Sequence, residues 1–155
     1  MNTTTRIAIF GALSGLVWSI VPGLLIGGFF KSWSELIALL VAGVLTGILV
    51  SFILSRPLRR LSRRGSLWLG ALALPLGAFC FGVVLSFVHL AASHFAGVEH
   101  VFAQYPFAPL TQGISFALLS VVSIFAVVFF PLSVFTTFAF RRFILRGSRR
   151  ENACS

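Results

Sequence analysis

Charge is what this chain has least of. Only three of its 155 residues are acidic, none of them aspartate, and charged residues of both signs together make up 10% of the sequence. A water-soluble domain usually carries charge on about a quarter of its residues, because its surface faces water. Hydrophobic residues reach 58% instead, and the mean hydropathy is +1.04. The composition excludes an ordinary water-soluble domain and indicates a membrane protein.

The residue patterns of common catalytic and metal sites are also missing. The two cysteines, Cys80 and Cys154, stand far apart and form neither a CxxC motif nor a Cys/His metal pattern. No serine lies in a Gly-x-Ser-x-Gly motif, and the chain has neither a glycine-rich phosphate loop nor a pair of carboxylates. We therefore expect no cofactor and no enzyme activity.

Long apolar stretches dominate what is present. Each is long enough to cross a hydrocarbon core of about 30 Å, which takes about 20 helical residues. A backbone in lipid must satisfy its own hydrogen bonds, so each stretch is predicted to be helical. We expect an all-α protein, a single transmembrane domain over residues 1–155 with four transmembrane helices in a bundle. The four stretches, free of Asp, Glu, Lys and Arg, are residues 7–30, 36–54, 67–92 and 114–140.

The last stretch is too long for a straight crossing, and we expect it to bend at Pro131, which lacks a backbone donor. The first stretch has an apolar part much longer than the roughly 7–15 residues of a signal peptide, so we expect an uncleaved span.

Arginine fixes the expected orientation. Eleven of the twelve cations are arginines, which cluster near Arg6, in a basic loop at 55–66 and in a basic tail at 141–155, whereas Lys31 stands alone. Cytoplasmic segments of membrane proteins carry the excess of Lys and Arg. We therefore expect both termini in the cytoplasm. The excess of arginine over lysine is compatible with a bacterial inner membrane, where we expect the protein to reside.

The arginines are also candidates for binding anionic lipid headgroups, because each cation near the membrane surface contributes about 1 kcal/mol of attraction. The net charge of +9 could suggest nucleic-acid binding, but no recognition domain remains outside the predicted spans, and we expect none. The lipid candidates are Arg56, Arg59, Arg60, Arg63, Arg64, Arg141 and Arg142.

The outer loop, residues 93–109, is the only sizeable segment outside the spans. Its apolar residues repeat with helical spacing, which predicts a short amphipathic helix lying against the outer leaflet. The stripe comprises Phe95, Val98, Val101, Phe102 and Tyr105.

Polar residues at the outer end of the third stretch form the only cluster that resembles a site. His89, His94, Glu99 and His100 are weak candidates for a metal or catalytic site. Their spacings of five, five and one residues do not match the i, i+3 or i, i+4 spacing of ligands on one helix face. We expect interfacial polar residues here, and no metal.

Small residues recur four apart in three of the stretches, a spacing that lets helix backbones approach closely in lipid. We expect these faces to pack within the bundle; dimerisation through one of them is the alternative. Serines in the stretches are expected to donate to their own backbone or to a neighbouring helix. The predicted packing glycines are Gly11, Gly15, Gly23, Gly27, Gly43, Gly47, Gly77 and Gly82.

Three functional hypotheses follow. The favoured one is a non-catalytic accessory, scaffold or assembly subunit that acts through helix packing with other membrane proteins or with itself. The second is a small oligomeric transporter or channel, although ion-coupled transport usually leaves a charge inside the membrane and none is present. The third is a membrane-embedded enzyme that uses the outer His/Glu cluster.

Overall fold

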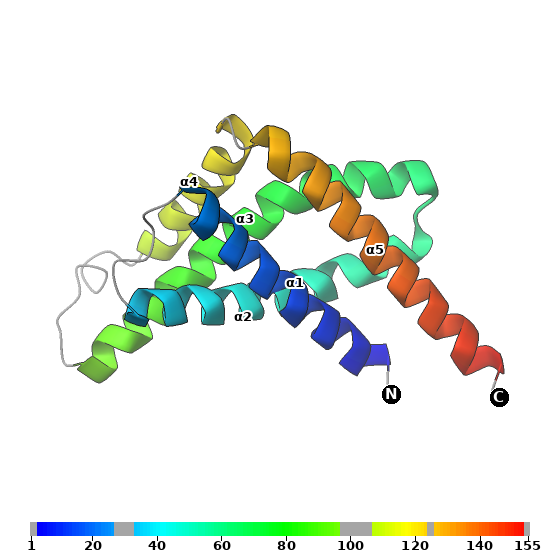
Figure 1. The fold of residues 1–155 in the computed structure, drawn as a ribbon, viewed down its shortest axis with the longest axis horizontal. Helices are drawn as coiled ribbons and strands as arrows, with labels where there is room; N and C mark the ends of the chain where they lie inside the picture. Colours follow the sequence, from blue (N-terminus) through cyan, green and yellow to red (C-terminus); the bar gives the residue numbers. More distant parts are fainter. Residues whose placement is uncertain (1–2, 27–32, 97–106, 124–125, 154–155) are drawn as a thin grey trace.

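The computed structural model describes residues 3–26, 33–96, 107–123 and 126–153, which form five helices in the order shown in Figure 1. No strand occurs in these ranges, and the all-α class predicted from the sequence is confirmed. The helices are α1 (Thr3–Ile26), α2 (Trp33–Arg60), α3 (Arg63–Ala96), α4 (Ala108–Val122) and α5 (Ala126–Ala153).

Three of the described helices contain a segment long and apolar enough to cross a membrane: Leu36–Leu58 in α2, Arg64–Ala92 in α3 and Ala126–Ile144 in α5. The described apolar segment of α1, Thr4–Ile20, and the whole of α4 are shorter. Large apolar side chains on these helices are widely exposed, as expected for surfaces that face lipid. The chain is therefore an integral membrane protein, and three of its described helices are able to span the bilayer.

The predicted basic loop at 55–66 is mostly helical, which corrects the sequence-based expectation. α2 continues through Pro57 to Arg60, and α3 begins three residues later. Ser62 explains the short connection, because its hydroxyl accepts a hydrogen bond from the Gly65 amide at 3.3 Å and so caps the start of α3. Arginine is also a good helix former, so the basic residues do not interrupt either helix.

The fourth apolar stretch is not one bent helix, which is a second correction. α4 ends at Val122, Ser123 adopts an extended backbone conformation, and α5 starts at Ala126. Pro131, the predicted bend, lies inside α5. The break retains hydrogen bonds, since the Ser123 amide donates to Leu119 O and the Ala126 amide donates to Ser123 O.

The outer segment can be compared with its prediction only in part. α3 extends to Ala96, beyond the predicted start of the outer loop, and α4 begins before its predicted end. Most of the predicted amphipathic helix lies in 97–106, outside the described residues. That element stays a prediction.

The helices pack as two hairpin-like pairs joined through α2 and α3. α1 makes its most extensive contacts with α2, and α3 with α4, while α5 lies mainly against α3. Both chain ends and the α2–α3 turn lie toward the same side of the ribbon, at the right in Figure 1. At that end the buried cluster Ile7, Leu54, Leu58, Phe140 and Ile144 joins α1, α2 and α5.

Candidate functional site

The contact between α1 and α2 is made by glycine backbones. A Cβ added to Gly11 would lie 2.6 Å from Gly47 O, and one added to Gly43 would lie 2.7 Å from Gly15 O. No side chain fits at such distances without moving a backbone. These four predicted packing glycines therefore lie in one internal contact between neighbouring helices.

Gly70, Gly77 and Gly82 of α3 divide into two kinds. A Cβ added to Gly82 would lie 2.9 Å from the Cα of Gly113 on α4, and one on Gly70 would lie 2.9 Å from the Cα of Val134 on α5. Gly77, by contrast, has nothing within 4 Å of such a Cβ. Gly77 was predicted to pack against a helix, and it faces open space instead.

Two predicted packing positions receive no structural description of their surroundings. Gly23 lies in α1, but the structure does not describe what surrounds it. Gly27 lies outside the described residues. Gly70 and Gly113 were missed by the sequence-based prediction. Gly113 stands four residues before Ala117, a small-residue spacing that could have revealed it.

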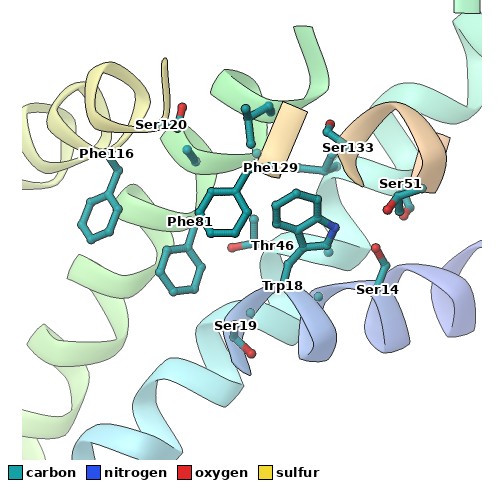
Figure 2. A pocket seen from close by; sticks show the side chains of 18 of the residues that line it. Ser14, Trp18, Ser19, Thr46, Ser51, Phe81, Phe116, Ser120, Phe129 and Ser133 are labelled. Atoms are coloured by element: carbon teal, nitrogen blue, oxygen red, sulfur yellow. The ribbon is translucent and has the colours of Figure 1, made fainter. Parts of the chain in front are cut away.

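The open space beside Gly77 belongs to a cavity of about 480 Å³ between the helices. Its volume falls within the range of about 300–1,000 Å³ typical of small-molecule sites. All five helices contribute to its wall. Figure 2 shows one such residue from each helix: Trp18, Thr46, Phe81, Phe116 and Phe129.

The cavity wall is apolar and uncharged. None of the described residues that line it is Asp, Glu, Lys, Arg or His. Its polar side-chain groups are the indole N–H of Trp18 and nine hydroxyls, which allow hydrogen bonding without net charge. The hydroxyls belong to Ser14, Ser19, Thr46, Ser51, Ser120, Ser123, Ser133, Thr136 and Thr137.

Several of these hydroxyls are already satisfied by backbone carbonyls. Ser19 donates to Leu16 O at 2.9 Å, Ser120 donates to Ala117 O at 2.7 Å, and Thr136 donates to Leu132 O at 2.8 Å. These bonds within one helix confirm the expectation from the sequence for Ser19 and Ser120. Such side chains present little unused polarity to the cavity.

Other hydroxyls link neighbouring helices. Ser133 on α5 donates to Gly70 O on α3 at 2.9 Å, in a buried environment. The Ser86 hydroxyl on α3 has one proton to donate, and both Gly82 O and the side-chain oxygen of Gln112 on α4 lie in position to accept it. These bonds fix α4 and α5 against different parts of the same long helix.

Thr46 differs from these residues. Its side chain is 6% exposed, and its hydroxyl oxygen is buried without a hydrogen-bond partner among the described residues. Leaving a buried hydroxyl unpaired costs about 1–3 kcal/mol. Figure 2 labels Thr46 among the side chains of the cavity wall, together with Phe81, Phe129 and Trp18.

The cavity wall also holds two pairs of aromatic rings. Trp18 and Phe129 have ring centroids 5.8 Å apart with planes at 52°, and Phe81 and Phe116 are 5.8 Å apart in an edge-to-face arrangement at 74°. Both distances lie within the range of favourable aromatic pairs. The two pairs bring together α1 with α5 and α3 with α4.

The break between α4 and α5 lies at this cavity, because Ser123 is part of its wall. α4 packs on α3 near Gly82, and α5 packs on α3 near Gly70. The break therefore lies alongside the middle of the apolar segment Arg64–Ala92. An irregular backbone at such a depth is tolerated in a membrane protein where it is buried in protein or lines a cavity.

The arginines proposed to bind lipid headgroups fall into different settings. Arg141 points inward: its guanidinium donates to Leu61 O at 3.0 Å and to Ser66 Oγ at 3.3 Å, which ties α5 to the α2–α3 turn. Its Nε is buried without a partner among the described residues. A headgroup cannot reach that nitrogen, so Arg141 serves as an internal tie.

For the remaining arginines, binding of anionic lipid headgroups stays a prediction. Arg56, Arg60, Arg64 and Arg142 are exposed, as headgroup binding requires. The side chains of Arg59 and Arg63 are not among those that the structure describes.

Most of the outer His/Glu cluster cannot be compared with its prediction, because three of its four side chains are not described. His89 is partly buried on α3, the side chain of His94 is not described, and Glu99 and His100 lie outside the described residues. Within the described part of the chain, no three His, Cys, Asp or Glu residues are placed to hold a metal ion. The cluster stays a prediction.

Comparison with known protein families, curated proteins and solved structures finds no match to this chain. The function must therefore be argued from the cavity itself.

Proposed function

We propose that this chain is a non-catalytic integral membrane protein that binds a neutral, lipophilic small molecule between its helices. The observation that carries the proposal is the cavity of about 480 Å³ lined by all five helices without a charged residue. An uncharged apolar cavity disfavours ions and charged substrates, because they would lose hydration without gaining a counter-charge.

The proposal includes four crossings of the bilayer, with α1, α2 and α3 as three and the broken pair α4–α5 together as the fourth. The order of contacts along α3 supports this, since α4 and α5 follow one another along its length. The proposal also includes a bacterial inner membrane with both termini in the cytoplasm, and the distribution of arginine supports that orientation.

An accessory role in a complex with other membrane proteins is compatible with ligand binding. The glycine face of α1 and α2 does not support it, because that face is occupied within the chain. In such a complex, this protein would supply a bound ligand to its partner, and the two proteins would not pack through the glycine face of α1 and α2.

A transporter is the second candidate, and the break at Ser123 favours it. Broken helices near the middle of the bilayer are a recurring feature of transporter binding sites. Mild-detergent extraction followed by mass spectrometry separates the two roles. A stable hetero-complex supports the accessory role, and a homogeneous homo-oligomer supports the transporter.

Ligand binding itself can be tested with Trp18 as the reporter. Trp33 and Trp68 are 82% and 76% exposed, so replacing both with Phe leaves Trp18, in the cavity wall, as the only tryptophan. This variant in lipid nanodiscs is titrated with bromobenzene, whose bromine quenches tryptophan fluorescence on contact. Saturable quenching is expected.

Gly77→Leu is the decisive variant, because its new side chain enters open space in the cavity. It should abolish the saturable quenching. Leu72→Phe, on the exposed face of the same helix, adds bulk outside the cavity and should leave the quenching unchanged. Quenching that rises without saturation, equally in all three proteins, would contradict the proposal.

A further inference from the structure

The accessible hydroxyls of the cavity narrow the class of ligand further. We infer that the molecule bound there carries a carbonyl oxygen, which accepts hydrogen bonds from the hydroxyls of Ser51 and Ser14. This inference rests on the proposed function, and it adds the chemical class of the ligand and the residues that orient it.

The hydroxyls of the described cavity wall differ in pairing and in access. The Thr46 oxygen is unpaired but enclosed by protein atoms, so a ligand does not reach it. The hydroxyls of Ser14, Ser51 and Ser123 also make no hydrogen bond within the described part of the chain, but their oxygens keep accessible surface. The remaining hydroxyls of the wall donate to backbone carbonyl oxygens and belong to Ser19, Ser120, Ser133, Thr136 and Thr137.

Ser51 is the most deeply buried of the three unpaired, accessible serines. Its side chain is 7% exposed and lies in the cavity wall on α2. A Cβ added to Gly11 of α1 would lie 2.9 Å from Ser51 Oγ and 2.6 Å from Gly47 O. Gly47 O is the carbonyl oxygen four residues before Ser51, one of the usual acceptors for a serine in a helix. Here α1 packs against both oxygens, and the Ser51 hydroxyl keeps a proton that no described group accepts.

Ser14 brings a second donor to the same place. It follows Gly11 by three residues in α1, and residues at this spacing are neighbours on one helix face, with Cβ atoms about 5–6 Å apart. Because Ser51 Oγ lies against Gly11, the two hydroxyls are about one helical turn apart. Figure 2 shows both side chains in the same part of the cavity wall. Two hydrogen bonds of about 2.8 Å span such a separation, so one oxygen between the serines can accept both.

A carbonyl oxygen fits this pair of donors. It has two lone pairs, so it can accept two hydrogen bonds at once. It also brings no net charge into the apolar interior, where the described cavity wall offers no basic or acidic residue to balance an ionic group. The rest of the ligand must be lipophilic, since most of the wall is carbon.

Two probes of nearly equal shape test this inference. 4-Bromoacetophenone carries a carbonyl oxygen where 1-bromo-4-ethylbenzene carries a methylene group, and the bromine of both quenches Trp18, which lies four residues after Ser14 on the same face of α1. Each probe is titrated, in nanodiscs, into the variant that has Trp18 as its only tryptophan and into the same protein with Ser51→Ala or Ser14→Ala. Comparing each probe between proteins cancels the different partitioning of the probes into lipid.

The two hydroxyls should matter only to the ketone. Ser51→Ala and Ser14→Ala are each expected to raise the half-saturation concentration of 4-bromoacetophenone about fivefold, the usual effect of one lost hydrogen bond. The value for 1-bromo-4-ethylbenzene should stay within about twofold of the parent, because this probe accepts no hydrogen bond. Saturable binding of the hydrocarbon also shows that each variant keeps its fold.

Ser19→Ala is the matched control, because Ser19 lines the same wall with the same 7% exposure but donates to Leu16 O. It should leave both probes unaffected. The inference is overturned if either Ser51→Ala or Ser14→Ala leaves ketone binding unchanged, or weakens both probes alike. Saturable binding of both probes to the parent would in that case leave the proposed function standing without this ligand class. Absence of saturable binding of both probes to the parent would overturn both proposals.

Discussion

Two regions of the molecule use glycine in opposite ways. Between α1 and α2, the backbones at Gly15 and Gly43 approach so closely that an added Cβ would collide with the facing carbonyl group. At Gly77 on α3, an added Cβ would meet no atom within 4 Å. The same residue type therefore forms a closed helix contact at Gly15 and Gly43 and leaves open space at Gly77, and all three glycines line the one cavity. The packing partner, rather than the glycine, decides between them.

The largest effect is expected from breaking the closed contact. Gly15→Ala should destabilise the protein by about 2–3 kcal/mol, because the new methyl group meets the backbone of Gly43 rather than a movable side chain. Unfolding by sodium dodecyl sulfate from mixed micelles measures the change. An effect below about 0.5 kcal/mol would show that α1 and α2 can separate without penalty.

A smaller loss of stability is expected from removing the hydrogen bonds of Arg141 to the α2–α3 turn. Arg141→Ala should cost about 1–3 kcal/mol, because Leu61 O and Ser66 Oγ lose the guanidinium donors. Arg142→Ala, at an exposed neighbour, should change stability by less than about 0.5 kcal/mol. Equal effects of the two substitutions in the same micelle assay would contradict the tie.

The hydrogen bond between α5 and α3 is expected to stabilise the protein less than the glycine contact between α1 and α2. Ser133→Ala removes the donor to Gly70 O and should cost about 0.6–1.7 kcal/mol, the range for such bonds in membrane proteins. Ser120→Ala, which removes a bond within α4 only, should cost less. The reverse order would place the stronger constraint on α4.

The smallest effect, and the only one of opposite sign, is expected at the open glycine. Gly77→Ala should stabilise the protein by up to about 1 kcal/mol, because alanine favours a helix over glycine and its methyl group meets no atom. A destabilisation by this substitution would mean that the space beside Gly77 closes in the membrane. Gly77 and Gly15 would then both lie in closed contacts, and the contrast between them would be wrong.

Apolar length and charge placement were sufficient to predict the membrane character and the helical class. They were insufficient for the fourth stretch, because hydropathy does not distinguish one long helix from two short ones. Pro131 drew attention as the only helix breaker there, yet a proline after the first turn of α5 is accommodated. Ser123 gave no sequence signal, since serines inside other helices of this chain simply bond back to their own carbonyls.

The cavity could not be predicted for a related reason. Spacing of small residues predicted close contact for Gly15 and Gly77 alike, and only the position of the neighbouring helices distinguishes them. The sequence gives no reason to single out Thr46, because the hydroxyl of a threonine in an apolar helix usually donates to its own backbone. Its unpaired state depends on the rotamer that its surroundings impose.

The contribution of every helix to one cavity has a thermodynamic consequence. A molecule that binds in the folded cavity and not to the unfolded chain adds its binding energy to the stability of the folded protein. By mass action, a ligand at a hundred times its dissociation constant would raise the free energy of unfolding by about 2.7 kcal/mol. A ligand of the proposed kind can therefore be sought in lipid extracts by the melting temperature alone, without any assay of activity.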